Sequence, residues 1–505
     1  MDGDVTFEQF MNLEGSQDID RILGKFGRFG VNLGLERILQ LLADLGDPHK
    51  DVPVIHVAGT NGKGSVCAYL SNVLTQAGYR VGRYTSPHLI SWCERICING
   101  QPIAVDTLRS LLRHIESVIR PEPATPTQFE VFTAAAWLYF AQRQVDVAVM
   151  EVGLGGRLDA TNVCDRPLVT IITSISRDHW QRLGPTLADI AREKAGILKP
   201  DRPAIIGPLP LEAETVFQER IAALHCPDFW PQPAQVLENG WAEYSPISKA
   251  QGFSPPASIQ YPLNLSGQHQ LTNSAVAIAA LYQLQQQGWR IPQDAIIQGL
   301  ATTKWPGRLQ WTYWRDGQGF VYKLLIDGAH NAAAAEALRH YVESLEPLKN
   351  EGQGEQGRQG EQGEVALGRG IGEIGRMGKM GGAKSKIQNP KSKISVSWLM
   401  GMLSTKDHAA IFKALLRPGD RLHLVPVPGH LSAELEELGA IAQSICPNLA
   451  VCQTHADLAL GLTAAMKDDQ TEESQLTVLC GSLYLVGHFL DKFRSAISPH
   501  LPPTQ

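Results

Sequence analysis

Short apolar runs alternate with helical patterns in the first third of the chain. The run from Val52 to Ala58 predicts a strand, and residues 66–78 have apolar positions at helical spacing that end in a glycine. Apolar runs at 145–152 and 168–175 predict two more buried strands. Strands that alternate with helices predict βαβ units in a parallel sheet. Because parallel strands end at one edge of a sheet, we expect the polar residues that follow these runs to lie together.

The second part of the chain repeats this organisation after a break. Proline and glycine at positions 306 and 307 interrupt any regular element. A strand is predicted at 321–326, before an alanine-rich helix, and apolar runs at 394–403 and 476–485 predict central strands of a second sheet. The sequence therefore predicts an α/β protein with an N-terminal domain at 1–303, a linker at 304–312 and a smaller α/β domain at 313–505.

Residues 351–382 have a different composition. Glycine occupies 12 of these 32 positions, compared with 47 of 505 in the whole chain, and the quasi-repeat GEQGRQGEQGE offers little that could pack. This composition favours a flexible insertion at about 350–393 over a folded element. We expect its basic residues to be solvated rather than to form a binding arm.

The charge and the apolar content exclude several functional classes. With 45 Lys and Arg and 51 Asp and Glu, the net charge is -6, so the chain has no basic field for nucleic acid. Its longest strongly apolar stretch, at 131–141, is shorter than the ~20 residues of a membrane-spanning helix. The acidic start does not resemble a secretory or transit signal, and eight cysteines without a CxxC pair do not form a disulfide framework. We expect a soluble, cytoplasmic protein that binds neither nucleic acid nor a membrane.

The first predicted strand leads into a glycine-rich heptapeptide. Glycines let successive backbone N–H groups turn toward one anion, the following helix adds its partial positive charge, and a lysine can reach the outer phosphates. The general phosphate-loop pattern has an earlier glycine where Val57 stands and Ser or Thr where Gly64 stands. The order of strand, loop and helix still favours a phosphate-binding loop over a structural turn. The loop comprises Gly59, Thr60, Asn61, Gly62, Lys63, Gly64 and Ser65.

Glu151 ends a predicted buried strand. An unpaired carboxylate there would lose much hydration free energy, so we expect a cation beside it. Mg²⁺ shared with ATP phosphates fits, because hard cations prefer oxygen ligands. A surface carboxylate at a strand end is the alternative. His179 follows Asp178 after the next predicted strand, where metal ligation competes with an ordinary core or surface position.

Polar residues also open the strand-to-helix turn of the C-terminal domain. Asp327, His330 and Asn331 lie there, and because aspartate and asparagine are common helix caps, a functional role and a capping role are equally open. Arg308 lies on the linker, from which it could reach a nucleotide, although a solvated arginine is the simpler interpretation.

Together these motifs resemble the folylpolyglutamate synthase and dihydrofolate synthase family, within the Mur-type ATP-dependent ligases. The similarity runs from about residue 30 to residue 487, apart from the glycine-rich insertion. The most specific match is EVGLGGRLDATN at 151–162, whereas GTNGKGS alone would fit the wider ligase group. The other matches are LGLERI (33–38), VAGTNGKGS (57–65), TSPHL (85–89), ERI (94–96), FE (129–130), DH (178–179), EKAGI (193–197), HQ (269–270) with Asn273, PGRL (306–309), DGAHN (327–331) and GSLYL (481–485).

The resemblance implies a fold and a reaction. It implies a P-loop, Mur-ligase-like N-terminal domain that binds ATP and pterin, and a Rossmann-like C-terminal domain that serves glutamate ligation. A pterin-side carboxylate would attack the γ-phosphate of ATP, and the amine of L-glutamate would displace phosphate from the acyl phosphate. The substrates would be ATP, L-glutamate and dihydropteroate or a reduced folate, with Mg²⁺ as cofactor. The protein would contribute placement and charge neutralisation.

The family's site residues map onto this sequence by motif. The resemblance implies that Lys194 is carbamylated, because an ammonium cannot ligate a cation whereas a carbamate offers two anionic oxygens. The implied magnesium ligands are Ser65, Ser86, Glu151, His179 and carbamylated Lys194. The implied nucleotide contacts beyond the loop are Asn273, Arg308 and Asp327, with His330 close to the γ-phosphate. The implied pterin contacts are Thr127, Gln128, Phe129, Glu130, Leu158, Asp159 and Ala160. The residues implied in catalysis are Lys63, Glu151, His179, Lys194 and His330.

Four positions depart from the family pattern. Ala332 stands where proline usually follows DGAHN, and Thr405 stands where the family usually has the first aspartate of DKD. The first change is expected to be conformational only, whereas the second weakens the expectation of polyglutamate-lengthening activity. Gln310 replaces an acidic residue after PGRL, and Ser274 replaces the alanine after Asn273.

Two other functions stay open on the sequence. A Mur-type ligase that joins amino acids to a cell-wall precursor would share the phosphate loop and the carbamate, although TSPHL and EVGLGGRLDATN match the folate branch. A nucleotide-binding regulatory protein would keep the loop without turnover, although every candidate magnesium ligand is present. The family resemblance also implies a monomer.

Overall fold

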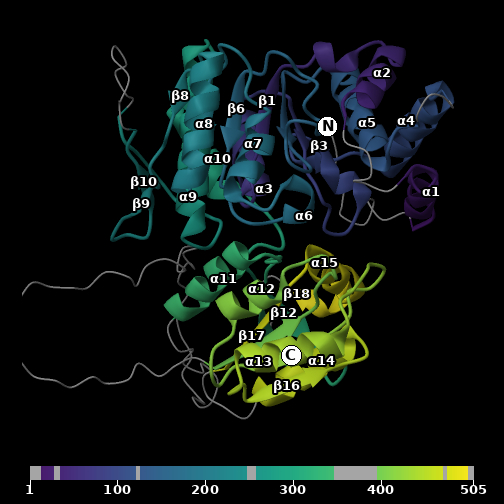
Figure 1. Ribbon diagram of the computed structural model, residues 1–505, viewed down its shortest axis with the longest axis vertical. Helices are drawn as coiled ribbons and strands as arrows, with labels where there is room; N and C mark the ends of the chain where they lie inside the picture. Colours follow the sequence, from purple (N-terminus) through teal and green to yellow (C-terminus); the bar gives the residue numbers. More distant parts are fainter. Residues whose placement is uncertain are drawn as a thin grey trace, which may run out of the picture. The chain divides into compact units, whose positions relative to one another are not determined.

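The structure is a computed structural model that describes residues 13–27, 34–120, 125–246, 257–345, 395–469 and 475–498. The glycine-rich insertion predicted at about 350–393 lies outside these residues. The chain divides into two compact units (Figure 1). The first comprises residues 1–235, 243–264 and 269–305, and the second comprises residues 236–242, 265–268 and 306–505.

The first unit is built on a sheet that has eight strands within the described residues, in the order β4-β3-β2-β5-β1-β6-β7-β8. Strands β2, β5, β1, β6, β7 and β8 are parallel, and β3 and β4 continue the sheet in antiparallel pairing. These strands are β1 (Val54–Ala58), β2 (Val81–Tyr84), β3 (Ile96–Ile98), β4 (Gln101–Pro102), β5 (Val147–Glu151), β6 (Val169–Ile172), β7 (Ala204–Ile206) and β8 (Asp228–Phe229). A separate sheet has the order β11-β10-β9, with β9 (Gln235–Val236), β10 (Ala242–Tyr244) and β11 (Ile259–Tyr261).

The three predicted strands of the first third are neighbours in this sheet. They correspond to β1, β5 and β6, and β1 lies between the other two in parallel register. Their carboxyl ends therefore meet at one edge, as the apolar pattern predicts. All five residues of β1 are buried, which explains why it is continuously apolar apart from His56.

Helices cover this sheet (Figure 1). Helix α3 packs against α9, α10 and strands β1, β2 and β5. Side chains of α4 and α5 share a core with Val54, and side chains of α7 and α8 share a core with Ala58. The helices are α1 (Leu13–Leu23), α2 (Glu36–Asp44), α3 (Lys63–Gln76), α4 (Val105–Val118), α5 (Gln128–Gln142), α6 (Trp180–Leu183), α7 (Leu187–Ala195), α8 (Leu211–Leu224), α9 (His269–Gln286) and α10 (Gln293–Thr302), with short 3-10 helices η2 (Pro48–Lys50) and η3 (Trp92–Arg95).

The second unit contains a sheet with the order β16-β15-β14-β17-β13-β12-β18. Strands β16, β15, β14, β17 and β13 are parallel, and β12 pairs antiparallel with β13 and β18. The strands are β12 (Gln310–Arg315), β13 (Val321–Ile326), β14 (Ser395–Met400), β15 (Arg421–Leu424), β16 (Val451–Thr454), β17 (Gln475–Cys480) and β18 (Ile497–Ser498). The helices are α11 (Ala332–Ser344), α12 (His408–Leu415), α13 (Leu435–Ile445), α14 (Leu458–Asp469) and α15 (Leu483–Lys492), with η4 (Arg494–Ala496).

The apolar run at 476–485 is a strand only in its first part. β17 ends at Cys480, and α15 begins at Leu483. Gly481 turns the chain with φ +98°, and the Ser482 Oγ caps the helix by accepting a hydrogen bond from the Tyr484 N–H at 3.2 Å. The prediction of a strand through residue 485 was therefore wrong, because an apolar run does not distinguish a buried strand from the start of a buried helix.

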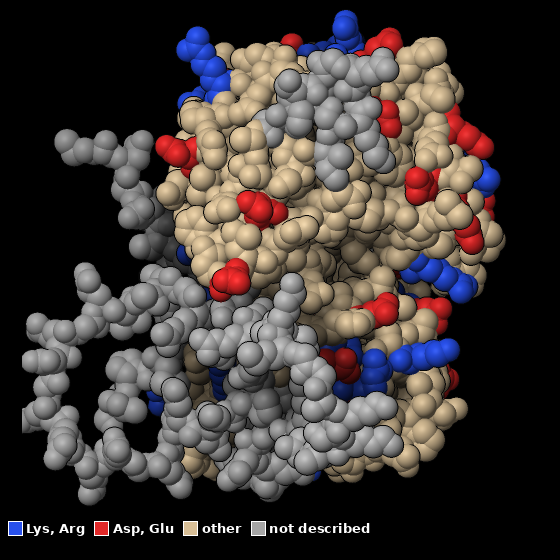
Figure 2. Space-filling model, turned by 90° about the vertical axis from the view of Figure 1, so that its left-hand side faces the viewer, with Lys and Arg blue, Asp and Glu red and all other residues tan. Residues whose placement is uncertain are grey.

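The apolar stretch at 131–141 lies within α5, most of whose residues are buried in the first unit. Among the helices in the described part of the chain, none combines the length and the apolar character that crossing a membrane requires. On the face shown in Figure 2, acidic and basic side chains are scattered among uncharged residues. That distribution agrees with the small net charge of -6.

A buried ion pair anchors the second unit. The Asp420 carboxylate accepts hydrogen bonds from Arg339 Nη1 at 2.7 Å, Trp398 Nε1 at 3.0 Å and the Arg417 N–H at 2.9 Å. Asp420 and Arg339 are 2% and 4% exposed. Burial raises the pKa of Asp420 even though the Arg339 charge opposes this rise.

Replacing Arg339 by methionine should destabilise the second unit by about 3–5 kcal/mol, because the substitution leaves the Asp420 charge buried without its cation. The pair of Arg109 and Asp106, whose side chains are 29% and 74% exposed, provides a control, and Arg109→Met should cost less than about 1 kcal/mol. Urea unfolding monitored by circular dichroism measures both. Equal costs for the two substitutions would contradict this account of the ion pair.

Candidate active site

The predicted phosphate loop connects β1 to α3. Gly59 and Gly62 have φ values of +147° and +88°, which side chains with a Cβ rarely adopt. A Cβ on Gly62 would lie 2.4 Å from Asn273 Oδ1. Because α3 begins at Lys63, earlier than the predicted residue 66, its first N–H groups have no acceptor within the helix and are available to an anion.

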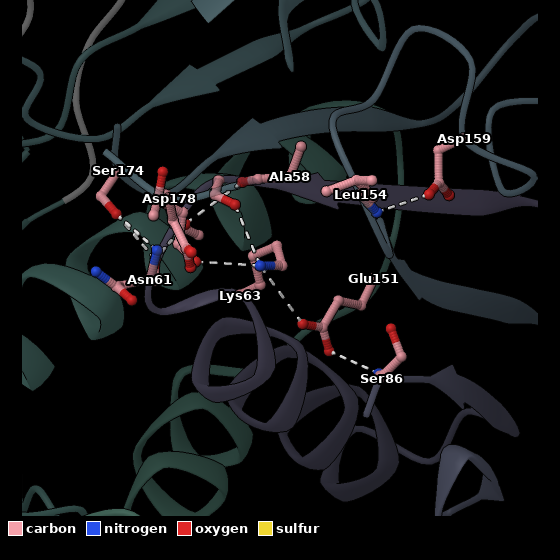
Figure 3. Close-up of polar contacts among 12 residues, drawn as sticks. Ala58, Asn61, Lys63, Ser86, Glu151, Leu154, Asp159, Ser174 and Asp178 are labelled. Atoms are coloured by element: carbon pink, nitrogen blue, oxygen red, sulfur yellow. Dashed lines mark hydrogen bonds and ion pairs between the residues drawn. The ribbon is translucent and has the colours of Figure 1, made fainter. Parts of the chain in front are cut away.

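A second segment, at residues 173–176, supports this loop. The Asn61 N–H donates to Ser174 Oγ at 3.1 Å, and Thr173 Oγ1 donates to the Asn61 carbonyl at 2.6 Å (Figure 3 labels Asn61 and Ser174). Thr60 Oγ1 donates to the Ser176 carbonyl at 3.1 Å. These hydroxyl residues were not predicted from the sequence. The polar sequence TSIS directly after a buried strand was the signal that could have found them.

Lys63 and Glu151 face each other beside the loop (Figure 3). Lys63 Nζ donates to the carbonyls of Gly59 at 3.1 Å and Thr60 at 3.2 Å, and it lies 4.0 Å from Glu151 Oε1. Glu151 is 5% exposed, and its Oε2 accepts a hydrogen bond from the Ser86 N–H at 3.3 Å. In this structure the cation beside Glu151 is Lys63, whereas the sequence analysis named Mg²⁺ as its partner.

Lys194 is a buried lysine next to the loop. It lies near the end of α7, is 5% exposed, and its Nζ donates to the Gly59 carbonyl at 2.9 Å. Burial, reinforced by the Lys63 charge, lowers the pKa of Lys194 to about 7, although Asp178 and Asp159 oppose the shift. A substantial fraction of this amine is therefore neutral at physiological pH. The neutral amine is the nucleophile that reacts with CO₂ to give a carbamate.

His179 lies directly before α6 in a left-handed backbone conformation, with φ +51°. Its N–H donates to Asp178 Oδ1 at 2.9 Å, and its Nε2 lies 3.9 Å from the same oxygen. The side chain is 49% exposed, whereas that of Asp178 is 10% exposed. His179 thus presents an accessible imidazole next to a largely buried carboxylate.

A buried amide joins Ser65 to Asn273. Gln270 Nε2 donates to Ser65 Oγ at 3.2 Å, and Gln270 Oε1 accepts from Asn273 Nδ2 at 3.0 Å and from Tyr69 Oη at 3.4 Å. Gln270 is 1% exposed. Two residues predicted to contact the nucleotide or its metal are therefore held by one side chain, to which the sequence analysis assigned no role.

Gly64 departs from the general phosphate-loop pattern for a reason that the structure makes visible. A Cβ at this position would lie 2.6 Å from the indole ring of Trp305. The Arg83 guanidinium packs over the same indole, 5.1 Å from the ring centroid. Serine or threonine at position 64 would therefore displace Trp305.

Gly64→Ala should raise the KM for ATP about tenfold, because the displaced indole shifts the first turn of α3. Small displacements of groups that bind substrate cause large losses of activity. Trp305→Ala in the same chain should restore part of the loss by removing the clash. Gly439→Ala is the control, since a Cβ there meets its nearest atoms only at 3.9–4.0 Å. An unchanged KM in Gly64→Ala would show that Trp305 does not constrain the loop.

The EVGLGGRLDATN segment packs tightly on the end of α7. A Cβ on Gly156 would lie 2.9 Å from the Glu193 carbonyl oxygen, and a Cβ on Gly196 would lie 2.3 Å from Arg157 Cβ. Arg157 also forms an ion pair with Glu193 at 2.8 Å. The motif therefore determines the position of the helix turn that carries Lys194.

The predicted pterin contacts fall on two segments of the first unit. Thr127 caps α5: its Oγ1 accepts a hydrogen bond from the Glu130 N–H at 3.3 Å, and its N–H donates to Glu130 Oε2. Arg37 binds both oxygens of Glu130 at 3.0 and 3.2 Å, so Glu130 holds the start of α5. Phe129 packs on Gly153, where a Cβ would come within 2.4 Å of the ring.

The second segment contains Leu158, Asp159 and Ala160. The Asp159 carboxylate is 4% exposed and accepts hydrogen bonds from the Leu154 N–H at 2.8 Å and the Thr161 N–H at 3.0 Å. Figure 3 shows the contact with Leu154. Burial raises the pKa of Asp159 while these hydrogen bonds oppose the rise. In this structure Asp159 stabilises the loop backbone.

In the second unit, three motifs meet at the carboxyl end of β13. The Asp327 carboxylate accepts hydrogen bonds from the Leu309 and Ala329 N–H groups, each at 2.8 Å. A Cβ on Gly328 would lie 2.3 Å from Leu483 and 2.4 Å from Arg308 Nη1. PGRL, DGAHN and GSLYL therefore form one cluster.

His330 and Asn331 complete this turn. His330 Nδ1 lies 2.8 Å from the Gly328 carbonyl. Because a carbonyl only accepts, Nδ1 carries the proton, and Nε2 is the unprotonated nitrogen of the neutral ring. The Asn331 Oδ1 accepts a hydrogen bond from the Ala334 N–H at 2.9 Å, so Asn331 is the N-cap of α11. The capping alternative therefore holds for Asn331.

Comparison with known proteins agrees with these motifs. The Mur ligase middle domain model matches residues 57–281, and the dihydrofolate synthetase C-terminal domain model matches residues 383–492. The dihydrofolate synthase/folylpolyglutamate synthase of Bacillus subtilis is 40% identical over 319 residues, which cover 62% of this chain and 72% of that protein. The chain belongs to the folylpolyglutamate synthase and dihydrofolate synthase family. It is therefore an ATP-dependent ligase.

Solved structures of this family have the same fold. The folylpolyglutamate synthase of Mycobacterium tuberculosis, complexed with ADP and AMPPCP, matches with a TM-score of 0.74 and 27% identity, covering 95% of this chain and 98% of that chain. The bifunctional folylpolyglutamate synthase/dihydrofolate synthase of Yersinia pestis, complexed with AMPPNP and Mn ion, matches with a TM-score of 0.69 and 28% identity. The match covers 94% of this chain and 96% of that chain. The predicted Mur-ligase-like α/β fold is confirmed.

The departures from the family pattern have local structural partners. Gln310 Oε1 accepts a hydrogen bond from the Gly307 N–H at 2.9 Å and closes the PGRL turn. Ser274 Oγ lies 2.8 Å from Tyr261 Oη. Ala332 is the first residue of α11, where proline and alanine are both tolerated. Beside Thr405, Asp407 is the N-cap of α12 and accepts a hydrogen bond from the Ala410 N–H at 3.1 Å.

Proposed function

We propose that this ligase adds L-glutamate to dihydropteroate, to a reduced folate, or to both, through an acyl phosphate. The observation that carries the proposal is the group of Lys63, Glu151 and Lys194 around one phosphate loop. The pterin-side carboxylate attacks the γ-phosphate of ATP, and ADP leaves. The glutamate amine then attacks the acyl carbon, loses a proton and expels phosphate.

The loop residues 59–65 bind the phosphates in this proposal. The N–H groups at the start of α3 donate to phosphate oxygens, and Lys63 exchanges its contacts with the Gly59 and Thr60 carbonyls for the outer phosphates. Glu151 stays close to the loop when Lys63 moves its positive charge to the phosphates. These residues place the γ-phosphate in line with the attacking carboxylate.

The donors around the loop fit Mg²⁺. Within the described residues, no group of three or more His, Cys, Asp and Glu side chains is arranged to hold a metal ion. Mg²⁺ commonly uses only one or two carboxylates, together with substrate phosphates and water. Bound Mg²⁺ would neutralise phosphate charge and polarise the reacting oxygens. The residues that would hold it are Ser65, Ser86, Glu151, His179 and carbamylated Lys194.

The remaining predicted residues have proposed binding roles. Residues 1–303 bind ATP and pterin, and residues 313–505 serve glutamate ligation. Asn273, Arg308 and Asp327 contact the nucleotide, and His330 Nε2 donates to the γ-phosphate once the ring is protonated. The proposed pterin contacts are Thr127, Gln128, Phe129, Glu130, Leu158, Asp159 and Ala160. We also propose that the protein acts as a cytoplasmic monomer.

Phosphate release from ATP tests this function. Purified protein receives ATP, Mg²⁺ and glutamate with dihydropteroate, with tetrahydrofolate, or without a pterin. Release with dihydropteroate alone identifies a dihydrofolate synthase, and release with both identifies a bifunctional enzyme. Release with tetrahydrofolate alone identifies a folylpolyglutamate synthase. Release that needs no pterin, or none under any condition, would contradict the proposal.

A further inference from the structure

His56 is a polar residue in the middle of the central strand of the first unit. It lies in β1 between Met150 of β5 and Thr170 of β6, and it is 1% exposed. Side chains alternate along a strand, so His56 points to the same face as Val54 and Ala58. A buried imidazole needs a hydrogen-bond partner, and here that partner comes from a loop.

The partner is Thr161, which is fully buried. His56 Nε2 lies 2.9 Å from Thr161 Oγ1, and Thr161 Oγ1 donates to Asp159 Oδ1 at 2.6 Å. The other Asp159 oxygen accepts from the Leu154 N–H at 2.8 Å. A continuous chain of hydrogen bonds therefore runs from the core of the sheet to the backbone of the loop at 153–161.

The proton positions in this chain follow from donor counts. Thr161 has one hydroxyl proton, which points to the Asp159 carboxylate, so its oxygen accepts from His56. His56 therefore carries its proton on Nε2. Burial lowers the pKa of His56 to about 3, which keeps the imidazole neutral. Neutral His56 has one fixed donor direction, and this fixes the orientation of the Thr161 hydroxyl.

We propose that His56 and Thr161 are positioning residues for the pterin substrate. They hold Asp159 and the loop at 153–161, on which Leu158 and Ala160 are placed. This inference rests on the proposed function, because it takes that loop as a pterin contact. The ATP loop has its own support from residues 173–176, so the KM for dihydropteroate should change more than the KM for ATP.

A matched pair of substitutions tests the inference. Thr161→Val removes the hydroxyl that links His56 to Asp159, whereas Thr170→Val removes a hydroxyl that is equally buried but donates to the Pro203 carbonyl. Thr161→Val should raise the KM for dihydropteroate about tenfold and change the KM for ATP less than twofold, because the reacting carboxylate is misplaced. Thr170→Val should change neither KM. Equal KM values for dihydropteroate in the two variants would overturn the inference, as would a parallel rise in both KM values in Thr161→Val.

Two variants of His56 provide a second test, which can still be made if Thr161→Val does not fold. Gln can place an N–H where the imidazole Nε2–H lies, whereas Met cannot donate. His56→Gln should keep the KM for dihydropteroate within about threefold of wild type, and His56→Met should raise it about tenfold. Equal values in these two variants would overturn the inference.

Hydrogen exchange separates failure of the inference from failure of the proposed function. The amides of 153–161 should exchange faster in Thr161→Val than in Thr170→Val, and this readout needs no substrate. A wild-type protein without pterin-dependent turnover would contradict the proposed function. Unchanged exchange would show instead that the hydrogen-bonded chain does not hold the loop, and would overturn the inference by itself.

Discussion

Replacing Lys194 by alanine should reduce pterin-dependent ATP turnover by roughly 10³-fold while the chain stays folded. Lys194 is buried beside the Gly59 carbonyl, and as a carbamate it would supply the oxygen ligands that an amine lacks. Without it, the phosphate charge is poorly neutralised in the transition state. Initial rates of phosphate release measure the effect.

Lys199→Ala is the control, because Lys199 is a partly buried lysine whose pKa is likewise lowered by burial, but it has no proposed role. It should keep near-wild-type turnover. Small carboxylic acids should partly restore Lys194→Ala by occupying the vacated space with a carboxylate. Wild-type turnover in Lys194→Ala would contradict the role of the carbamate.

The proposed carbamate also predicts a pH dependence. Only the neutral amine reacts with CO₂, and burial lowers the pKa of Lys194 to about 7. The modified fraction should therefore fall as the pH drops below about 7 and rise again with added bicarbonate. Native mass spectrometry should show the mass of one added CO₂ near pH 8 and its loss at acidic pH. Activity that falls in the opposite direction, toward alkaline pH, would contradict this assignment.

Lys63→Met should lower the turnover number by roughly 10²–10³-fold, because in the proposed function Lys63 supplies positive charge to the outer phosphates in the transition state. Methionine keeps much of the buried aliphatic volume, so folding should be preserved. Loss of the charge also leaves Glu151, 4.0 Å from Nζ, without its present cation. Steady-state rates with varied ATP separate the effect on the turnover number from that on the KM.

Lys50→Met serves as the control for Lys63→Met. Lys50 forms an exposed ion pair with Asp47 at 2.7 Å, and such pairs contribute little to stability. Its substitution should leave both kinetic constants unchanged. A Lys63→Met protein with a raised KM and an unchanged turnover number would show that Lys63 binds ATP in the ground state only.

The sheet edge at the phosphate loop was predictable from the sequence because its strands are fully buried. Strands β1, β5 and β6 are fully buried and mostly apolar, and each has polar residues at its carboxyl end or directly after it. The same criterion failed at Leu483, where an apolar run continues into a helix after Gly481. Apolar character reports burial, and it separates strand from helix only when periodicity or length adds information.

The side chains that hold the phosphate loop in place were not predictable in this way. Gln270 reaches Ser65 through the tertiary packing of α9 on α3, and Thr173 reaches the Asn61 carbonyl from the segment that follows β6. Nothing local in the sequence specifies such contacts. The glycine at position 64 could not be explained from the sequence either. Trp305, which leaves no room for a side chain there, lies far along the chain.

Transfer of oxygen from the substrate carboxylate to phosphate tests the central claim most directly. Dihydropteroate labelled with ¹⁸O in its carboxylate is incubated with the enzyme, ATP, Mg²⁺ and glutamate, and the phosphate is analysed by mass spectrometry. Attack of that carboxylate on the γ-phosphate predicts that each phosphate released carries one oxygen from a substrate carboxylate. Turnover that releases only unlabelled phosphate would contradict the acyl phosphate and the arrangement of the site around it.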